Sequence, residues 1–136
     1  MNDLSECTVL VVDDTEANVD LMVSLLGREY DVAVAMDGET ALETAMSEPP
    51  DLILLDIVMP GMNGYEVCER LKANETTKDI PVMFLSANIE EPDREKALAL
   101  GAVDFIAKPV DIMEVQEKVR NCLVQNRNRE YPGDTP

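Results

Sequence analysis

The chain has 136 residues, enough for one domain that buries about two-thirds of the surface exposed by its unfolded chain. Its 28 acidic residues outnumber its 11 basic residues, and the formal net charge of -17 argues against direct binding to nucleic acid or to an anionic membrane. The sequence contains no histidine, which excludes Ser-His-Asp and Cys-His catalysis and any imidazole metal site.

Five short apolar runs are predicted to be strands. They cover residues 7–12, 31–35, 51–56, 80–85 and 103–107. The third run contains four consecutive large aliphatic residues, from Leu52 to Leu55, with no polar alternation. Such a run is typical of a strand buried on both faces, as in the centre of a parallel sheet.

Helical patterns follow each of these runs. In the first, apolar spacing predicts a buried stripe through Leu21, Met22, Leu25 and Leu26, and Gly27 is placed to end the helix in a left-handed conformation. Later helices should begin at Asn63, near Glu90 and at Asp111, where polar side chains can cap a first turn.

Strict alternation of strands and helices with short connections predicts a (βα)5 fold. Because the crossovers are right-handed, the five strands should form one parallel sheet with helices on both faces. We expect a short lead-in over residues 1–6, one domain over residues 7–124, and a flexible polar tail over residues 125–136 that is too short for a second domain.

Polar groups stand at the carboxyl ends of four predicted strands. Asp13 and Asp14 follow the first, Asp56 ends the third, Ser86 follows the fourth and Lys108 follows the fifth. In a parallel sheet these ends meet at one edge, where ligands of open α/β folds bind. Carboxylates about 4 Å apart repel by about 4 kcal/mol per pair at an effective dielectric near 20, so the cluster calls for a cation or a raised pKa.

The chemistry of these groups suits a phosphoryl group beside a hard cation. Oxygen ligands favour Mg²⁺ over transition metals. Lys108 could neutralise one phosphoryl oxygen, Ser86 could donate a hydrogen bond to another, and Asp56 could be the nucleophile. Asp13 could instead cap the first helix or hold Lys108, and Ser86 alone would be an ordinary loop serine.

The chain resembles the receiver domain of two-component response regulators, from about Cys7 to Leu123. The resemblance lies in residues 11–14 (VVDD), 54–64 (LLDIVMPGMNG), 84–87 (FLSA), 101–105 (GAVDF) and 107–109 (AKP). It implies a flavodoxin-like fold and a signalling domain that catalyses only its own phosphorylation and dephosphorylation.

The resemblance also implies roles for individual residues. Asp56 would take a phosphoryl group from a phosphohistidine of a sensor histidine kinase or a histidine phosphotransfer protein, forming an aspartyl phosphate. Asp13, Asp14, Asp56 and the main-chain carbonyl of Val58 would hold Mg²⁺.

Further implied roles concern the phosphoryl group and the response to it. Ser86 and Lys108 would grip the phosphoryl oxygens, and a cis peptide would join Lys108 to Pro109. The switch position is Phe105, where many receivers have tyrosine, so its ring could move but could make no hydroxyl contact.

The same resemblance implies an output surface and control of phosphoryl lifetime. The surface would extend from about Ile89 to Leu123, bind a downstream protein and could support a phosphorylation-dependent homodimer. Val58 and Asn88 stand at positions that influence access of hydrolytic water.

Three alternatives stay open. An acid-nucleophile phosphatase of related fold would have a D-x-D pattern after the first strand, where this chain has adjacent Asp13 and Asp14. A flavin-binding module would need a phosphate-binding loop that these acids would repel. The chain could also be a receiver cut from a longer multidomain regulator.

Several features of the sequence predict a cytoplasmic protein. The cysteines are scattered, the N-terminus has no signal-peptide features, and no apolar run is long enough to span a membrane.

Overall fold

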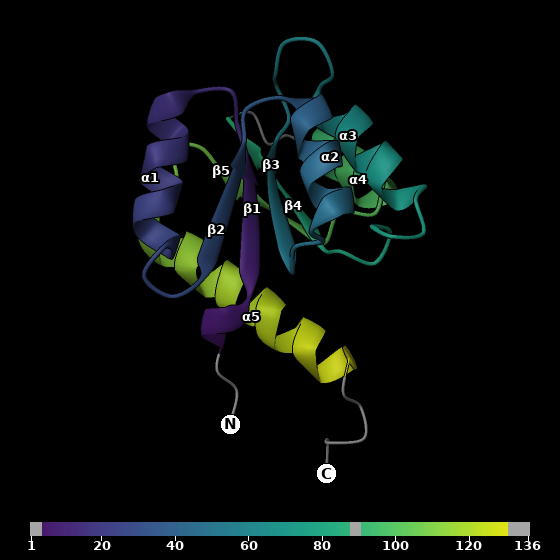
Figure 1. The fold of residues 1–136 in the computed structure, drawn as a ribbon. Coiled ribbons are helices and arrows are strands. Elements are labelled where there is room, and N and C mark those ends of the chain that lie inside the picture. Colours follow the sequence, from purple (N-terminus) through teal and green to yellow (C-terminus); the bar gives the residue numbers. More distant parts are fainter. Residues whose placement is uncertain (1–3, 88–90, 131–136) are drawn as a thin grey trace.

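Five parallel strands form one sheet in the order β2-β1-β3-β4-β5 (Figure 1). The computed structural model describes residues 4–87 and 91–130. A short 3-10 helix, Leu4–Glu6, precedes the sheet. The strands are β1 (Thr8–Val12), β2 (Asp31–Ala35), β3 (Leu52–Asp56), β4 (Val82–Ser86) and β5 (Asp104–Ala107).

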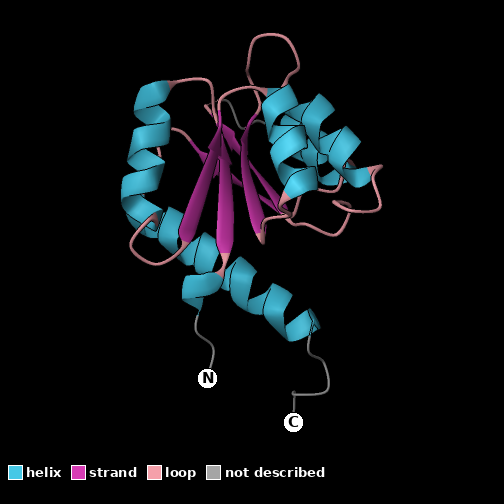
Figure 2. Ribbon diagram, in the orientation of Figure 1, coloured by secondary structure: helices cyan, strands magenta, loops and turns pink. Residues whose placement is uncertain are grey.

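Helices cover both faces of the sheet, which confirms the predicted flavodoxin-like (βα)5 fold (Figures 1 and 2). One face carries α1 and α5, and the other carries α2, α3 and α4. Their bounds are α1 (Glu16–Leu26), α2 (Gly38–Ser47), α3 (Gly64–Lys72), α4 (Glu91–Ala99) and α5 (Ile112–Glu130).

The central strand β3 is buried along its whole length. Its alternate side chains enter two different cores: Ile53 and Leu55 pack towards α2 and α3, while Leu52 and Leu54 pack towards α1 and α5. An aliphatic run is stable here because both faces of the strand are removed from water. The strand ends on Asp56, so the first polar group of this segment lies at the edge of the sheet.

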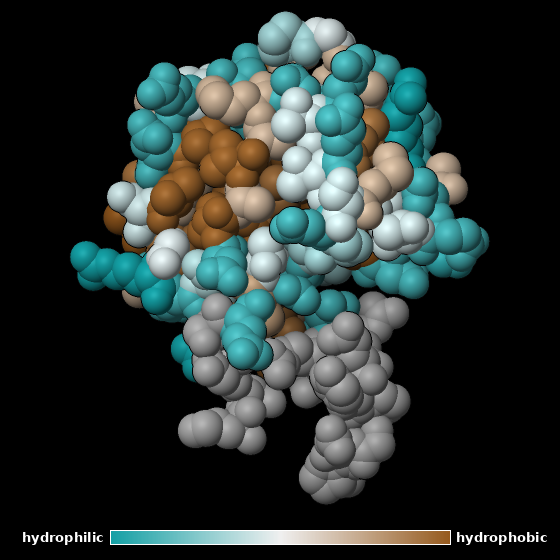
Figure 3. Space-filling view, viewed as in Figure 1, coloured by the Kyte–Doolittle hydropathy of each residue, from teal (hydrophilic) through white to brown (hydrophobic). Residues whose placement is uncertain are grey.

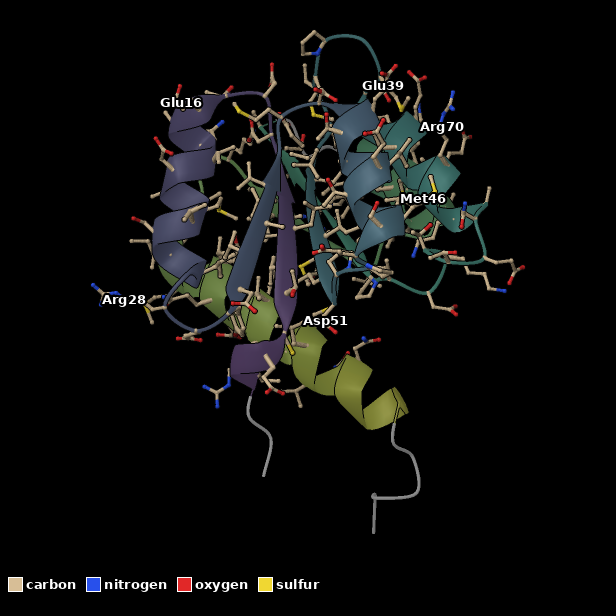
Figure 4. All side chains as sticks on the ribbon, viewed as in Figure 1. Glu16, Arg28, Glu39, Met46, Asp51 and Arg70 are labelled. Carbon is tan, nitrogen blue, oxygen red and sulfur yellow. The ribbon has the colours of Figure 1, made fainter. Side chains whose placement is uncertain are left out.

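The opposite end of the same strand has a structural aspartate. Asp51, labelled in Figure 4, lies just before β3, and its Oδ2 accepts a hydrogen bond of 2.7 Å from the backbone N–H of Thr8. This bond joins the start of β1 to the start of β3. Asp51 and Asp56 therefore mark the two ends of one strand and lie far from each other.

Strand β2 forms one edge of the sheet, and apolar side chains lie exposed beside it. Val34 of β2 and Val23 of α1 are each 38% exposed. Figure 3 shows apolar surface between these two elements. The other edge strand is better covered, because Lys118 of α5 donates a 2.7 Å hydrogen bond to the carbonyl of Phe105 in β5.

Helix α1 differs from its predicted form. Val19, Met22 and Leu26 are buried, whereas Leu21 is 43% exposed. The sequence of α1 is apolar on more than one side, so two overlapping stripes were available and packing selected the one through Val19. The prediction of a left-handed Gly27 is wrong as well, because its φ is -66° and the chain continues the right-handed turn.

Helix α5 also differs, because it continues to Glu130 while the expected tail begins at residue 125. Residues 125–130 contain neither glycine nor proline, and a helix propagates easily once its first turns are fixed. The rest of the expected tail, residues 131–136, lies outside the described part of the chain.

Candidate functional site

The register of the sheet brings the polar strand ends to one edge. Val12 pairs with Leu55, and Asp56 pairs with Leu85 in the next strand. The carboxylates of Asp13, Asp14 and Asp56 consequently gather, each offering an oxygen within 4.8 Å of the others.

These three acids differ in their exposure to water. Asp13 is 0% exposed and Asp56 is 6% exposed, whereas Asp14 is exposed. The site is thus a buried pair of carboxylates with a third one at its mouth.

Lys108 lies between the two buried acids. Its Nζ is 3.0 Å from Asp13 Oδ2 and 3.2 Å from Asp56 Oδ1. Its position is fixed by the backbone, because the Lys108 N–H donates a 2.9 Å hydrogen bond to the carbonyl of Ser86 in the neighbouring strand. The Lys108–Pro109 peptide bond that follows is cis.

Asp13 makes one of the two contacts that were considered for it from the sequence: it holds Lys108 but does not cap α1, whose N-cap residue is Thr15. Its Oδ1 accepts a 2.9 Å hydrogen bond from the Thr15 N–H at the start of α1, and its Oδ2 binds Lys108. A single carboxylate therefore orders the β1–α1 connection and holds the lysine. The exposed Asp14 lies beside it at the entrance to the site.

The remaining predicted residues occupy different positions around this cluster. Ser86 is 7% exposed at the end of β4, and Phe105 is 6% exposed in β5. Val58, in the loop after β3, is 78% exposed. Asn88 and Ile89, the latter being the first residue of the expected output surface, lie outside the described residues.

The electrostatics of the site follow from this packing. Burial raises the pKa of the Asp56 carboxyl above its ordinary value; attraction to Lys108 opposes the shift and repulsion from Asp13 adds to it. Burial disfavours the charged form of Lys108, but its contacts with Asp13 and Asp56 outweigh this effect and raise its pKa. Lys108 is therefore held as an ammonium ion beside the two buried carboxyl groups.

The donor set fits a divalent cation. Three carboxylates and one ammonium leave two formal negative charges without compensation. All side-chain donors in the acidic cluster are oxygens, which are the ligands that Mg²⁺ prefers. A hard cation at the mouth of the site would remove the remaining repulsion.

One residue that positions the site was missed as such by sequence reasoning. Gly64 begins α3, and a Cβ atom at this position would come 2.8 Å from Ile57 Cα and clash with the backbone oxygen of Asp56. The Gly64 N–H donates a 2.8 Å hydrogen bond to the Ile57 carbonyl. The start of α3 thus packs directly on the chain that follows Asp56. A glycine next to the capping residue Asn63 was the available signal.

Comparison with known proteins identifies the family. The sequence matches the model of the response regulator receiver domain over residues 9–120. The chain belongs to the receiver domain family of response regulators. This receiver domain is 48% identical to response regulator PleD of Caulobacter vibrioides in an alignment 132 residues long that covers 92% of this chain and 29% of PleD.

Solved structures show the same fold. Chemotaxis protein CheY4 of Vibrio cholerae superposes with a TM-score of 0.83 at 25% identity, covering 87% of this chain and 99% of CheY4. The receiver domain of sensor histidine kinase PA1611 from Pseudomonas aeruginosa has a TM-score of 0.80 at 29% identity, covering 88% and 98% of the two chains. That structure has a magnesium ion coordinated in its active-site cleft.

None of the helices within 4–87 and 91–130 combines the length and apolar character needed to cross a bilayer.

Proposed function

We propose that this receiver domain accepts a phosphoryl group on Asp56 from the phosphohistidine of a sensor histidine kinase or a histidine phosphotransfer protein. The main support is the position of Asp56 at the end of the fully buried strand β3, with the Lys108 ammonium 3.2 Å from its Oδ1. The domain then signals to a downstream protein through the surface between residues 89 and 123.

The chemical step is an in-line displacement at phosphorus. A carboxylate oxygen of Asp56 forms the new O–P bond, the P–N bond to the donor imidazole breaks, and the bonding electrons leave with the imidazole. Lys108 already contacts Asp56 and can move its ammonium to a phosphoryl oxygen. Ser86, at the end of the neighbouring strand β4, can donate a hydrogen bond to a second oxygen.

Bound Mg²⁺ would neutralise charge on the phosphoryl oxygens. The side chains of Asp13, Asp14 and Asp56 would hold it together with the carbonyl of Val58. Because Asp13 already accepts hydrogen bonds on both oxygens, the exposed Asp14 offers the readier ligand.

The response to phosphorylation runs through the fifth strand. Ser86 moves towards the phosphoryl group, and the ring of Phe105 changes position beside it, which alters the output surface. Val58, exposed next to Asp56, and Asn88 control the access of hydrolytic water. Phosphorylation of Asp56 could also drive homodimer formation.

This function does not include turnover of an external substrate. An acid-nucleophile phosphatase would hydrolyse many donor molecules, whereas a phosphoacceptor takes one label per chain. We place the protein in the cytoplasm, where its donors reside, and its net charge of -17 disfavours direct contact with nucleic acid or membrane lipid.

The greater length of the curated relatives supports a second possible role for this chain. This chain spans about 30% of the length of the first two curated relatives, one of which is PleD. We therefore also propose that the receiver can serve as the input domain of a longer regulator. A purified full-length gene product that ends at residue 136 and signals normally would contradict this.

The decisive experiment compares two aspartates of the same strand segment. With radiolabelled acetyl phosphate and Mg²⁺, the unmodified protein and Asp51→Asn should each take up one label per chain, and Asp56→Asn should take up none. Asp51 is the matched control because its role is a backbone hydrogen bond at the far end of β3. Labelling of Asp56→Asn at the level of the unmodified protein would remove Asp56 as the acceptor, and repeated turnover would favour the phosphatase.

A further inference from the structure

Three of the five aromatic residues of this protein form a row across one face of the sheet. Phe105 of β5 and Phe84 of β4 occupy paired positions in neighbouring strands and belong to the same core. Tyr65 of α3 packs edge-on against Phe84, with ring centroids 5.4 Å apart and an interplanar angle of 67°. The row lies on the face that α2, α3 and α4 cover (Figure 1).

Two cations of α4 lie on the two ends of this row. The guanidinium carbon of Arg94 is 5.1 Å from the centroid of the Phe105 ring. Two residues later, Lys96 Nζ is 4.3 Å from the centroid of the Tyr65 ring. A cation over an aromatic face is attracted by the ring quadrupole. Helix α4 therefore spans the row and contacts β5 at one end and α3 at the other.

The other described side chains of α4 provide little anchorage. Among its described side chains, residues 94–99, Ala97 alone is buried, and Leu98 is 55% exposed. One buried alanine removes little apolar area from water, so the two cation–ring contacts are a large share of what fixes residues 94–99 in place. Movement of either ring should consequently change the position of α4.

Phe105 depends on Arg94 more than a tyrosine would. A phenylalanine has no hydroxyl group through which a polar partner could fix its position, so the face of the ring is its only polar contact. The ring is 6% exposed, and Arg94 is the exposed residue that lies over it.

We propose that Arg94 is a positioning residue that holds the Phe105 ring in its buried place and so sets the balance between ring positions before phosphorylation. Its relevance to signalling rests on the proposed function, in which the ring responds to the phosphoryl group on Asp56. The contact itself is a property of the unphosphorylated chain and can be tested alone.

The composition of the chain makes the test direct. The protein has two phenylalanines, so replacement of both by 4-fluorophenylalanine gives two fluorine resonances. Phe84 is 0% exposed and serves as an internal reference. The variants to compare are Arg94→Met, Arg94→Lys and, as the matched control from the same helix, Lys96→Met.

We expect Arg94→Met to shift the Phe105 ring equilibrium about two- to fivefold away from the buried position, the range that follows from one exposed cation–ring contact. The displaced resonance should show a larger solvent isotope shift in D₂O, while the Phe84 resonance stays in place. Arg94→Lys should restore part of the original spectrum because it keeps a cation, and Lys96→Met should leave the Phe105 resonance unchanged.

Two results would overturn the inference. One is an unchanged Phe105 resonance in Arg94→Met, and the other is an equal displacement in Lys96→Met, which would indicate general loosening of α4. Adding acetyl phosphate and Mg²⁺ to the unmodified protein tests the proposed function separately. If Arg94→Met moves the Phe105 resonance but phosphorylation conditions do not, the positioning role of Arg94 stands and the switch role of Phe105 fails.

Discussion

Removal of the negative charge on Asp56 should stabilise the domain when no divalent cation is present. Asp56→Asn keeps the size of the side chain and an oxygen that can still contact Lys108. It removes a carboxylate that lies within 4.8 Å of those of Asp13 and Asp14. The acceptor site would then be a source of instability that the fold tolerates for its function.

The magnitude follows from the distances. At an effective dielectric near 20, two charges at the upper limit of 4.8 Å repel by about 3.5 kcal/mol, so Asp13 and Asp14 together disfavour the Asp56 carboxylate by about 7 kcal/mol or more before solvent screening. Attraction to Lys108 at 3.2 Å offsets about 5 kcal/mol. Asp14 is exposed, so solvent and salt weaken its share. We expect the free energy of unfolding to rise by about 1–2 kcal/mol, or several degrees in Tm. The raised pKa of Asp56 agrees with this predicted direction, because it also means that the fold disfavours the charged carboxylate.

The assay is urea unfolding followed by circular dichroism, since the chain has no tryptophan. In EDTA, Asp56→Asn should unfold at a higher urea concentration than the unmodified protein. Addition of Mg²⁺ should stabilise the unmodified protein more than the variant, because the variant has lost a ligand. Asp51→Asn, which relieves no repulsion, is the control. An Asp56→Asn midpoint equal to or below that of the unmodified protein in EDTA would refute this electrostatic reasoning.

Three other predictions concern the surroundings of the site and the fold. Gly64→Ala should destabilise the domain by about 1–3 kcal/mol, because its Cβ would overlap the backbone after Asp56; an unchanged urea midpoint would contradict this. Val58→Asn should lose radiolabelled phosphate faster than the unmodified protein, because an exposed valine cannot orient hydrolytic water; equal decay rates would defeat the idea. Burial and the neighbouring Glu29 raise the pKa of Tyr30 from 10.0 to about 12. Tyr30 should therefore stabilise the fold below pH 10 and lose that contribution between about pH 10 and 12, a loss that Tyr30→Phe should not show in alkaline unfolding curves.

The sheet and its acidic edge could be predicted because both depend on short-range patterns. A run of four aliphatic residues from Leu52 to Leu55 between turn signals is typical of a strand buried on both faces, and the structure buries all four. Once all strands are parallel, the residues that follow them must share one edge, whatever their distance along the chain. The structure brings Asp13, Asp56 and Lys108 together by this route.

Other features depend on contacts that no local pattern encodes. The buried face of α1 was misassigned because its sequence offers two apolar stripes, and only packing against the sheet selects the one through Val19. Gly64 has to be glycine because of the backbone of another segment. The contact between Arg94 and Phe105 joins an exposed charge to a ring eleven residues later, and the sequence carries no spacing rule for such a pair.

Different elements of the fold hold the acidic site in place and allow the movement that we expect after phosphorylation. Uncompensated carboxylates can be held close together only by a rigid support, and β3, buried along its whole length, provides one. A chemical change there can alter the surface only if a neighbouring element is weakly fixed. Residues 94–99 of α4 meet this need, since Ala97 is the one buried side chain among them and two cation–ring contacts are a large part of what fixes them to the core. A phosphoryl group on Asp56 would add negative charge there and draw Lys108 and Ser86 towards its oxygens. We expect the free energy of these new contacts to shift the weakly fixed residues 94–99, whereas β3, buried along its whole length, should stay in place.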